Sequence, residues 1–436
     1  MPTCKRYFMN INTGSATGRV LLSLLIGILP LFTWSQDTTK LLPNGTDGLT
    51  FNPADTGKNM KPNEFVGPIA TFKIGLGYIH DFVTYSESDK FKQQMDSLHY
   101  NLKPDFKLRD FRVLGSGVFK TKRYLAFKFA YMWDGDNEKW LVRESGLTIG
   151  VPELAGHIFI GRTKEGYSMV KVMNGHSPWT AERQMALDVI PILADGIKYF
   201  GYLPKPRVFW NLGAYNDILS KGQGFSTYAW QYDARVGWLP IYDKKTNEVL
   251  HVGINLRYGK PVDGKITLKS RPESNPTPQI INTGAFTADH SSHIGAEVYY
   301  SNKGFLIGSE IMMHNFYADN AENHRFYGGN VVVTWLFTGA VRPYSTNGNI
   351  LGFVPVKKSV FKGGWGEWEA VVHYSMLDLN NRSIAGGKFW RLTPMINWYM
   401  TKVIRMEFVY GYGVLDRFNI KGPVQFFQGR LQFTLM

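Results

Sequence analysis

Seven lysine and arginine side chains recur on the polar faces of stretches that have the two-residue periodicity of β-strands. They are Lys73, Lys128, Arg235, Arg257, Arg391, Arg405 and Arg430. Rings or ladders of such bases along an aqueous path select anions. Acids occupy the same faces, at Asp233, Glu297, Glu310, Glu369 and Glu407. Each base is therefore open to two interpretations: it binds anions in a pore, or it pairs with an acid and keeps the face polar.

Three further bases lie in a stretch with a different pattern, residues 164–193. They are Lys164, Lys171 and Arg183. Part of this stretch, Thr180–Leu187, has helical spacing and a threonine at the position of an N-cap. The three bases could line a constriction if the stretch folds inward. The alternative is a loop that lies in solvent.

Other residues whose types could support catalysis or metal binding do not form a complete catalytic or metal-binding set. The acidic run Asp134–Glu138 resembles part of a calcium loop but lacks its twelve-residue pattern. His290 and His293 have no evident third metal ligand, and His373 and Ser375 share the polar face of one strand. No nucleophile elbow, HExxH sequence or phosphate loop occurs. The sequence thus predicts a protein that is not an enzyme and needs no metal or cofactor.

Three consecutive strands near the carboxyl terminus, 368–376, 390–398 and 404–410, indicate how these residues are positioned. Each strand has one apolar face and one mostly polar face, and tryptophan and tyrosine gather near the strand ends. A β-barrel in lipid requires this pattern, with apolar side chains outward, a polar lumen and aromatic rings at the two interfaces. We expect Phe127, Trp230, Ile254 and Phe408 to face lipid. Tyr228 has the parity of Trp230 and is expected to do the same.

The same periodicity predicts about sixteen strands along the chain. Short connections at 120–122, 204–206, 302–304 and 401–402 all follow even-numbered strands, and the longer ones mostly follow odd-numbered strands. Bacterial outer-membrane barrels segregate short periplasmic turns from long outer loops in this way. The stretch 339–364 is a long exception on the short side. The predicted fold class is all-β, a transmembrane antiparallel barrel wide enough for an aqueous channel.

Composition and the amino terminus indicate export. Among 436 residues, 44% are hydrophobic and 15% aromatic. The one long apolar run, Val20–Phe32, follows a basic segment and precedes a small-x-small cleavage pattern, which predicts a signal peptide over 1–35. Residues 36–66 are predicted to be a periplasmic or disordered leader, and 67–436 the barrel domain. The only cysteine, Cys4, falls in the predicted signal peptide. The predicted mature chain would carry no disulfide.

Net charge points to an anionic partner. Lys5, Arg6 and Arg19 precede residue 36, so removing them from 49 bases leaves 46 against 35 acids, a charge of +11. Nucleic acid is a poor candidate partner for an exported protein. Outer-membrane lipid and small anions are the partners that we expect.

Several sequence elements resemble the phosphate-selective porin family. They are GGWGEWEAVVHYSMLDLNN and AGGKFWRLTPMINWYMTKVIRMEFVYGYG within 363–413, Phe337-Thr338-Gly339 followed by Val341-Arg342-Pro343-Tyr344, and Ser270-Arg271-Pro272-Glu273 followed by Thr283-Gly284. The resemblance covers roughly 71–436 and is weakest before residue 195. It implies a sixteen-stranded barrel, a homotrimer that passes anionic solutes, and a third outer loop that folds inward at 164–193. The chain departs from outer-membrane barrels at its end, where Met436 replaces the usual phenylalanine.

These observations predict a channel for passive diffusion of small anions, phosphate among them, in the outer membrane of a Gram-negative bacterium. One alternative is a porin that is general or serves another solute. The other is a barrel without a channel, either structural or a lipid hydrolase.

Overall fold

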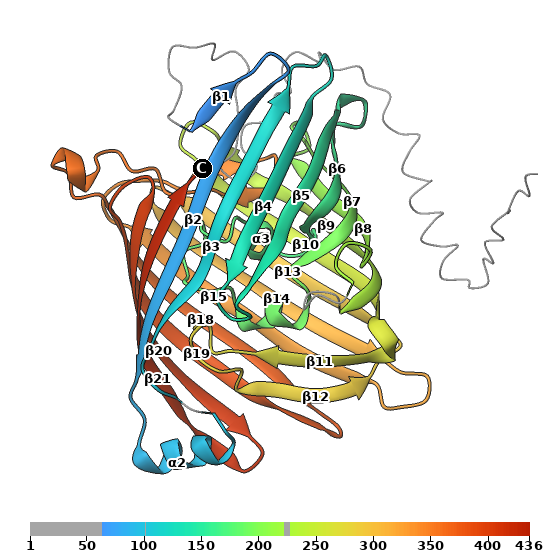
Figure 1. Ribbon diagram of the computed structural model, residues 1–436, viewed down its shortest axis with the longest axis vertical. Helices are drawn as coiled ribbons and strands as arrows, with labels where there is room; N and C mark the ends of the chain where they lie inside the picture. Colours follow the sequence, from blue (N-terminus) through green and yellow to red (C-terminus); the bar gives the residue numbers. More distant parts are fainter. Residues whose placement is uncertain (1–62, 101, 222–226) are drawn as a thin grey trace, which may run out of the picture.

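The protein is a closed antiparallel barrel of sixteen strands (Figure 1). The computed structural model describes residues 63–100, 102–221 and 227–436. The strands are β2 (Ala70–Tyr85), β3 (Asp105–Phe119), β4 (Leu125–Asp134), β5 (Lys139–Val151), β6 (Gly156–Lys164), β7 (Leu193–Leu203), β8 (Val208–Asn216), β9 (Tyr228–Asp243), β10 (Glu248–Pro261), β13 (His290–Asn302), β14 (Phe305–Tyr317), β15 (His324–Leu336), β18 (Glu367–Asn381), β19 (Ile384–Tyr399), β20 (Ile404–Arg417) and β21 (Ile420–Leu435). Each pairs with its sequence neighbour, and β21 closes on β2 from Leu76↔Leu435 to Tyr85↔Phe426. Closure leaves no strand edge, so the backbone of the wall is satisfied internally, as lipid requires.

Smaller elements decorate the two ends of the barrel. The strand β1 (Glu64–Val66) pairs with β2 near the end where the carboxyl terminus lies. The opposite end carries helix α2 (Asp89–Ser97) and the hairpin of β11 (Lys265–Ser270) with β12 (Ile281–Thr287). Because β1 falls within 36–66, the end of that predicted leader is part of the sheet. The predicted signal peptide lies outside the described residues. No helix of the described residues is long and apolar enough to cross a bilayer.

The two faces of the wall follow the predicted alternation. Ile254 and Phe408 point outward and remain 57% and 48% exposed, and Trp230 packs on the outer face against Tyr258. The prediction for Tyr228 is wrong. A register shift between β10 and β9 beside Pro261 turns this ring inward, where the Arg257 guanidinium lies 4.0 Å from its centroid.

Connection lengths agree with the predicted parity at one end only. At the end where the carboxyl terminus lies, called the terminal end, every connection between barrel strands is short except 337–366. At the opposite end, long connections such as 165–192 and 262–289 occur together with short ones such as 135–138 and 382–383. The predicted rule of short connections therefore holds at the terminal end, whereas the predicted rule of long connections does not hold throughout the opposite end.

The lumen is packed, which corrects the expectation of an open aqueous interior. The third loop (residues 165–192) crosses it with α3 (Met169–Val172) and the 3-10 helix η4 (Met185–Val189). The plug segment (residues 337–366), with its short strands β16 (Tyr344–Ser345) and β17 (Ile350–Leu351), enters from the terminal end. Both contribute to one buried apolar cluster, through residues such as Met173, Trp179, Tyr344 and Leu351. Barrel diameter is thus a poor guide to the free space inside.

The predicted helix at Thr180–Leu187 is also wrong. The third loop forms helical turns at Met169–Val172 and at Met185–Val189, so most of the predicted helix, Thr180–Gln184, is not helical. Glu182 instead reaches two arginines of the wall, Arg109 and Arg430, at 2.6 Å each. These ion pairs hold the segment in a conformation that its local sequence pattern does not favour.

Candidate anion path in the lumen

The seven predicted wall bases all project into the lumen, and six of them form ion pairs there. The pairs are Lys73–Glu64 (2.7 Å), Lys128–Glu144 (2.5 Å), Arg235–Glu297 (2.7 Å), Arg257–Glu165 (3.1 Å), Arg405–Glu407 (3.2 Å) and Arg430–Asp81 (2.6 Å). The seventh, Arg391, donates to Thr393 and to the carbonyl of Pro272. All except Lys128 are at most 5% exposed. Of these six pairs, Arg257–Glu165 reaches the third loop and the others stay within the sheet. Arg235 also donates to a carbonyl of the plug segment, and Arg405 and Arg430 donate to carbonyls of the third loop. Inward orientation by itself therefore does not make a base a pore-lining one.

The predicted acids of the opposite wall anchor the third loop. The carboxylate of Glu297 accepts from the Met169 amide at 2.8 Å, and that of Glu310 accepts from the Ser168 hydroxyl at 2.5 Å. Asp233 accepts from the Gly166 amide at 2.8 Å. Backbone amides at the start of a helical turn are natural partners for carboxylates. These contacts fix the loop across the lumen.

The three predicted loop bases lie in different surroundings. Lys171 is completely buried and pairs with Glu165. Lys164 is 5% exposed, pairs with Glu144 at 3.1 Å and donates to the Met173 carbonyl at 2.7 Å. Arg183 is half-buried and donates to the carbonyls of Val170 and Met173. Arg183 is therefore the loop base with the best access to solvent.

A partly exposed group of four bases lies on the adjoining wall, and only one of them, Lys128, was predicted from the sequence. We call Arg109 and Arg112 of β3, Lys128 of β4 and Arg143 of β5 the basic wall. The side chains of Arg109, Arg112 and Lys128 keep 20%, 11% and 22% exposure, far more than the other wall bases. A hollow of about 50 Å³ lies between this wall and the third loop, lined by Arg112, Lys128, Arg143, Lys164 and His176 among others. This hollow thus lies along a basic surface.

Two β-bulges explain why simple alternation missed these arginines. Between β2 and β3, Ile79 faces Asp110 while His80 faces Leu108, so Arg109 is an extra residue. Between β4 and β5, the register skips across Arg143 and Glu144. A bulge inserts one residue and re-aims side chains that strict alternation would send to the other face. The irregular pattern of residues 106–119 was the available signal in the sequence.

Acids next to the basic wall pair with its arginines and link it to the third loop. Asp110 accepts from Arg109 and Arg112, each at 2.6 Å, and Glu182 of the third loop also bonds to Arg109. Burial alone would raise the pKa of Glu182, but the guanidinium groups of Arg109 and Arg430 outweigh it and hold that pKa below the ordinary glutamate value. Glu182 therefore stays ionised and ties the third loop to the wall.

Several wall side chains hold the plug segment: Arg235 donates to the Asn349 carbonyl at 2.9 Å, His251 bonds to the Tyr344 hydroxyl at 2.7 Å, and the buried Arg342 makes the largest set of contacts. The Arg342 guanidinium bonds to both carboxylate oxygens of Glu369 on β18, at 2.9 and 3.1 Å, and to the Tyr399 hydroxyl at 2.7 Å. It also donates to the carbonyls of Ser177 in the third loop and Gly352 in the plug segment. Arg342 is 2% exposed and thus joins the wall, the third loop and the plug segment.

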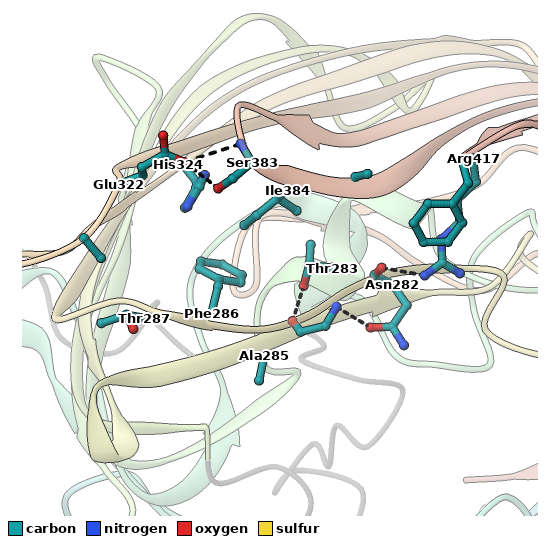
Figure 2. Close-up of a pocket in the computed structure, with 14 residues that line it drawn as sticks. Asn282, Thr283, Ala285, Phe286, Thr287, Glu322, His324, Ser383, Ile384 and Arg417 are labelled. Carbon is teal, nitrogen blue, oxygen red and sulfur yellow. Dashed lines mark hydrogen bonds between the residues drawn. The ribbon is translucent and has the colours of Figure 1, made fainter.

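A larger hollow of about 760 Å³ opens at the end opposite the carboxyl terminus (Figure 2). It lies between β12, the 318–323 connection and the turns that follow β18 and β20. Its charged groups are engaged: Glu322 accepts from the amide and hydroxyl of Ser383, and Arg417 donates to the carbonyls of Ile280 and Asn282. The charged groups of this hollow therefore stabilise the loops that surround it.

The remaining candidate chemical residues are distributed in ways that do not form a reaction centre. His293 bonds to His314 and Ser291 inside the barrel, whereas the neighbouring candidate ligand His290 stacks on Tyr317. The two ring nitrogens of His373 lie 3.2 Å from Glu273 and 3.1 Å from Asn330, so neither faces Ser375. Asp136, in the acidic hairpin, pairs with Lys107 and Arg271.

No group of three potential metal ligands occurs among residues 63–100, 102–221 and 227–436. Closed walls, an apolar outer face, a polar lumen and inward loops instead define the protein as an outer-membrane β-barrel of the channel-forming class.

The chain belongs to the family of phosphate-selective porins O and P, whose family model matches residues 96–434. A curated relative from Caulobacter vibrioides, described as an uncharacterized protein, is 24% identical over 181 residues, which cover 40% of this chain and 36% of that protein. The chain thus matches only about a third of that relative's length. Family membership supports a channel rather than an enzyme, and a location in the outer membrane.

Solved porins share the fold at low sequence identity. OmpF of Salmonella typhi, solved with daunomycin, superposes with a TM-score of 0.54 at 11% identity, over 85% of this chain and 99% of that one. OmpT of Vibrio cholerae gives 0.52 at 12% identity, over 85% and 99%. The anion-selective porin from Comamonas acidovorans gives 0.52 at 10% identity, over 84% and 99%. These similarities establish the barrel architecture.

Proposed function

We propose that this protein is a passive channel for small anions and that the anions move along the basic wall, between β3–β5 and the third loop. The observation that carries the proposal is the position of the hollow left in the lumen. In a lumen whose other wall bases are almost completely buried, Arg109, Arg112 and Lys128 keep partial exposure beside a hollow. Passage requires no reaction and no cofactor.

Charge supports anions over cations. The four bases of the basic wall face the acids Asp110, Glu144 and Glu182, and Arg183 adds a further positive charge from the third loop. Unit charges beside low-dielectric walls interact more strongly than in bulk water. Salt screens charges over about 8–10 Å, so the local excess at a narrow point matters more than the total charge of the lumen.

Phosphate is a reasonable solute to test first. The family is named for phosphate selectivity, and one structural neighbour is described as anion-selective. We assign structural roles to the other predicted pore-lining bases. Lys73 pairs with Glu64 of β1, and the rest bond to loop segments that enter the barrel, namely Arg235, Arg257, Arg391, Arg405 and Arg430. Of the predicted constriction bases, we assign Arg183 to the path and Lys164 and Lys171 to the support of the third loop.

Planar-bilayer recording of the purified protein tests this proposal. In a KCl gradient, the wild-type reversal potential should indicate anion preference. The double variant Arg112→Gln with Arg143→Gln should shift the reversal potential toward the equilibrium potential of the cation. Lys388→Gln with Lys421→Gln, at exposed side chains near the strand ends opposite the carboxyl terminus, is the matched control and should leave it unchanged. A cation-preferring wild type, or equal shifts in both double variants, would contradict the assigned path.

The packed lumen favours a second candidate, a channel that conducts only after its inward segments move. In that case well-folded protein would be silent in the bilayer until the plug segment is released. Variants of Arg342 separate this candidate from a constantly open pore, because they should release the plug segment without unfolding the wall.

Export and assembly complete the proposal. The predicted signal peptide would be removed near residue 36, so amino-terminal sequencing that found Val20–Phe32 retained would refute it. The resemblance to phosphate-selective porins supports a homotrimer. Native mass spectrometry in detergent tests that state, and a monomer at all detergent concentrations would contradict it.

A further inference from the structure

Charge is distributed unequally between the two ends of the barrel. The connections at the terminal end, which are 120–124, 152–155, 204–207, 244–247, 303–304, 337–366 and 400–403, contain thirteen lysines and arginines and one acid, Glu153. All of these bases except Arg342 are exposed. The connections at the opposite end contain ten bases and fourteen acids. A strongly basic rim therefore exists at one end only, and it does not follow from the overall charge.

The most prominent part of this basic rim also carries exposed aromatic rings. Within the plug segment, residues 357–366 project sideways from the barrel near the terminal end (Figure 1). We call these residues the tip. Phe361 is 76% exposed and Trp365 83% exposed, and the exposed lysines Lys357, Lys358 and Lys362 accompany them. Aromatic side chains beside lysines are typical of segments that lie in a membrane interface.

Hydrogen bonds hold the tip on the lipid-facing side of the wall. The Trp365 carbonyl accepts from the indole nitrogens of Trp368 at 3.1 Å and Trp398 at 2.9 Å. These two indoles stack on each other with centroids 5.0 Å apart, on the outer face of β18 and β19. Trp335 and Phe337 are also outward and exposed on the neighbouring strand end. The tip thus continues the aromatic belt of the barrel rather than extending into the aqueous phase.

We propose that the tip and the basic rim bind anionic phospholipid headgroups of the leaflet at the terminal end of the barrel. Phe361 and Trp365 insert among the upper acyl chains, and Lys357, Lys358 and Lys362 contact the phosphates. No acid lies within 337–366 to compete for these lysines. Attraction of a lysine to an anionic bilayer surface is additive to a first approximation, so three together give substantial selectivity over zwitterionic lipid.

Lipid retention tests the proposal with a matched control. Full-length barrel is reconstituted in vesicles of phosphatidylcholine with phosphatidylglycerol, extracted in mild detergent and assayed for bound lipid. We expect the wild type to be enriched in phosphatidylglycerol. K357Q/K358Q/K362Q should reduce that enrichment by about tenfold or more. K90Q/K92Q/K103Q removes three exposed bases from the opposite end and should leave it unchanged. Equal losses in both variants, or no enrichment in the wild type, would overturn the proposal.

A depth measurement distinguishes lipid from the other occupants of this surface. Ser359→Cys in a Cys4→Ser background receives a spin label, and its accessibility to oxygen and to an aqueous nickel complex is measured in the same vesicles. The proposal predicts a label at the interface, with Gln93→Cys on α2 as the aqueous control. A label in water would overturn the proposal and favour a soluble acidic partner. A label shielded from both reagents would overturn it and favour contact with a second copy.

Discussion

Replacing Arg342 by alanine should release the plug segment from the lumen. The Arg342 guanidinium makes two hydrogen bonds of 2.9 and 3.1 Å from Nη2 to Glu369, one to the Tyr399 hydroxyl, and others to the carbonyls of Ser177 and Gly352. Its removal leaves the Glu369 carboxylate, which is 0% exposed, without a counter-charge. Breaking one side of a buried ion pair costs about 3–5 kcal/mol.

That cost should appear as a local rather than a global change. The wall strands keep their complete backbone ladder, whereas β16 and β17 pair only with each other through two register positions. Since each 1.4 kcal/mol is tenfold, roughly a hundred- to several-thousand-fold more barrels would have the plug segment displaced. We therefore expect Arg342→Ala to keep the heat-resistant gel mobility of a folded barrel while its plug segment becomes susceptible to added protease.

Conductance gives the functional measurement for the same variant. If the plug segment closes the lumen, Arg342→Ala should raise the open probability in a planar bilayer. The double variant Arg342→Met with Glu369→Leu is the control, because apolar replacement of both partners of a buried ion pair is often nearly neutral for stability. It should resist protease like the wild type. Wild-type conductance together with wild-type protease resistance in Arg342→Ala would refute the reasoning.

Three further predictions concern the wall, the third loop and an outer loop. Phe408→Arg should destabilise the folded barrel by about 2–4 kcal/mol if the residue lies at mid-bilayer, measured by urea unfolding in vesicles. In membranes, Phe408→Cys should react with an impermeant maleimide more slowly than the water-exposed Gln93→Cys. Equal labelling rates would disprove the lipid-facing position of Phe408. Arg183→Glu should move the reversal potential toward the cation, and an unchanged value would remove Arg183 from the path. Burial raises the pKa of Glu87 to about 7, so the 86–104 loop should lose protection from hydrogen exchange as pH rises from about 4.5 through 7; Glu87→Gln should abolish that dependence, and persistence of the dependence would assign it to another group.

The sequence by itself determined the wall of this protein. Two-residue alternation in stretches such as 368–376 and 404–410 predicts which side chains face lipid, because each residue of a paired strand must point to one of two faces. The same alternation predicted sixteen strands and the inward orientation of Arg405 and Glu407. Alternation did not predict the orientation of Tyr228, Arg109 and Arg143, because register shifts change the face that a side chain points to without an unambiguous local signal.

Only the tertiary structure decided what fills the lumen. Glu297, Glu310 and Asp233 read as polar wall residues, yet each accepts a hydrogen bond from the third loop, distant in sequence. Likewise, Arg342 lies in a stretch without periodicity, and its partners Ser177 and Glu369 are 165 and 27 residues away. Local patterns encode the face of a strand, but the pairing of charges across a barrel depends on where long segments meet in space. Contacts between segments distant in sequence therefore determine how much of the lumen is filled.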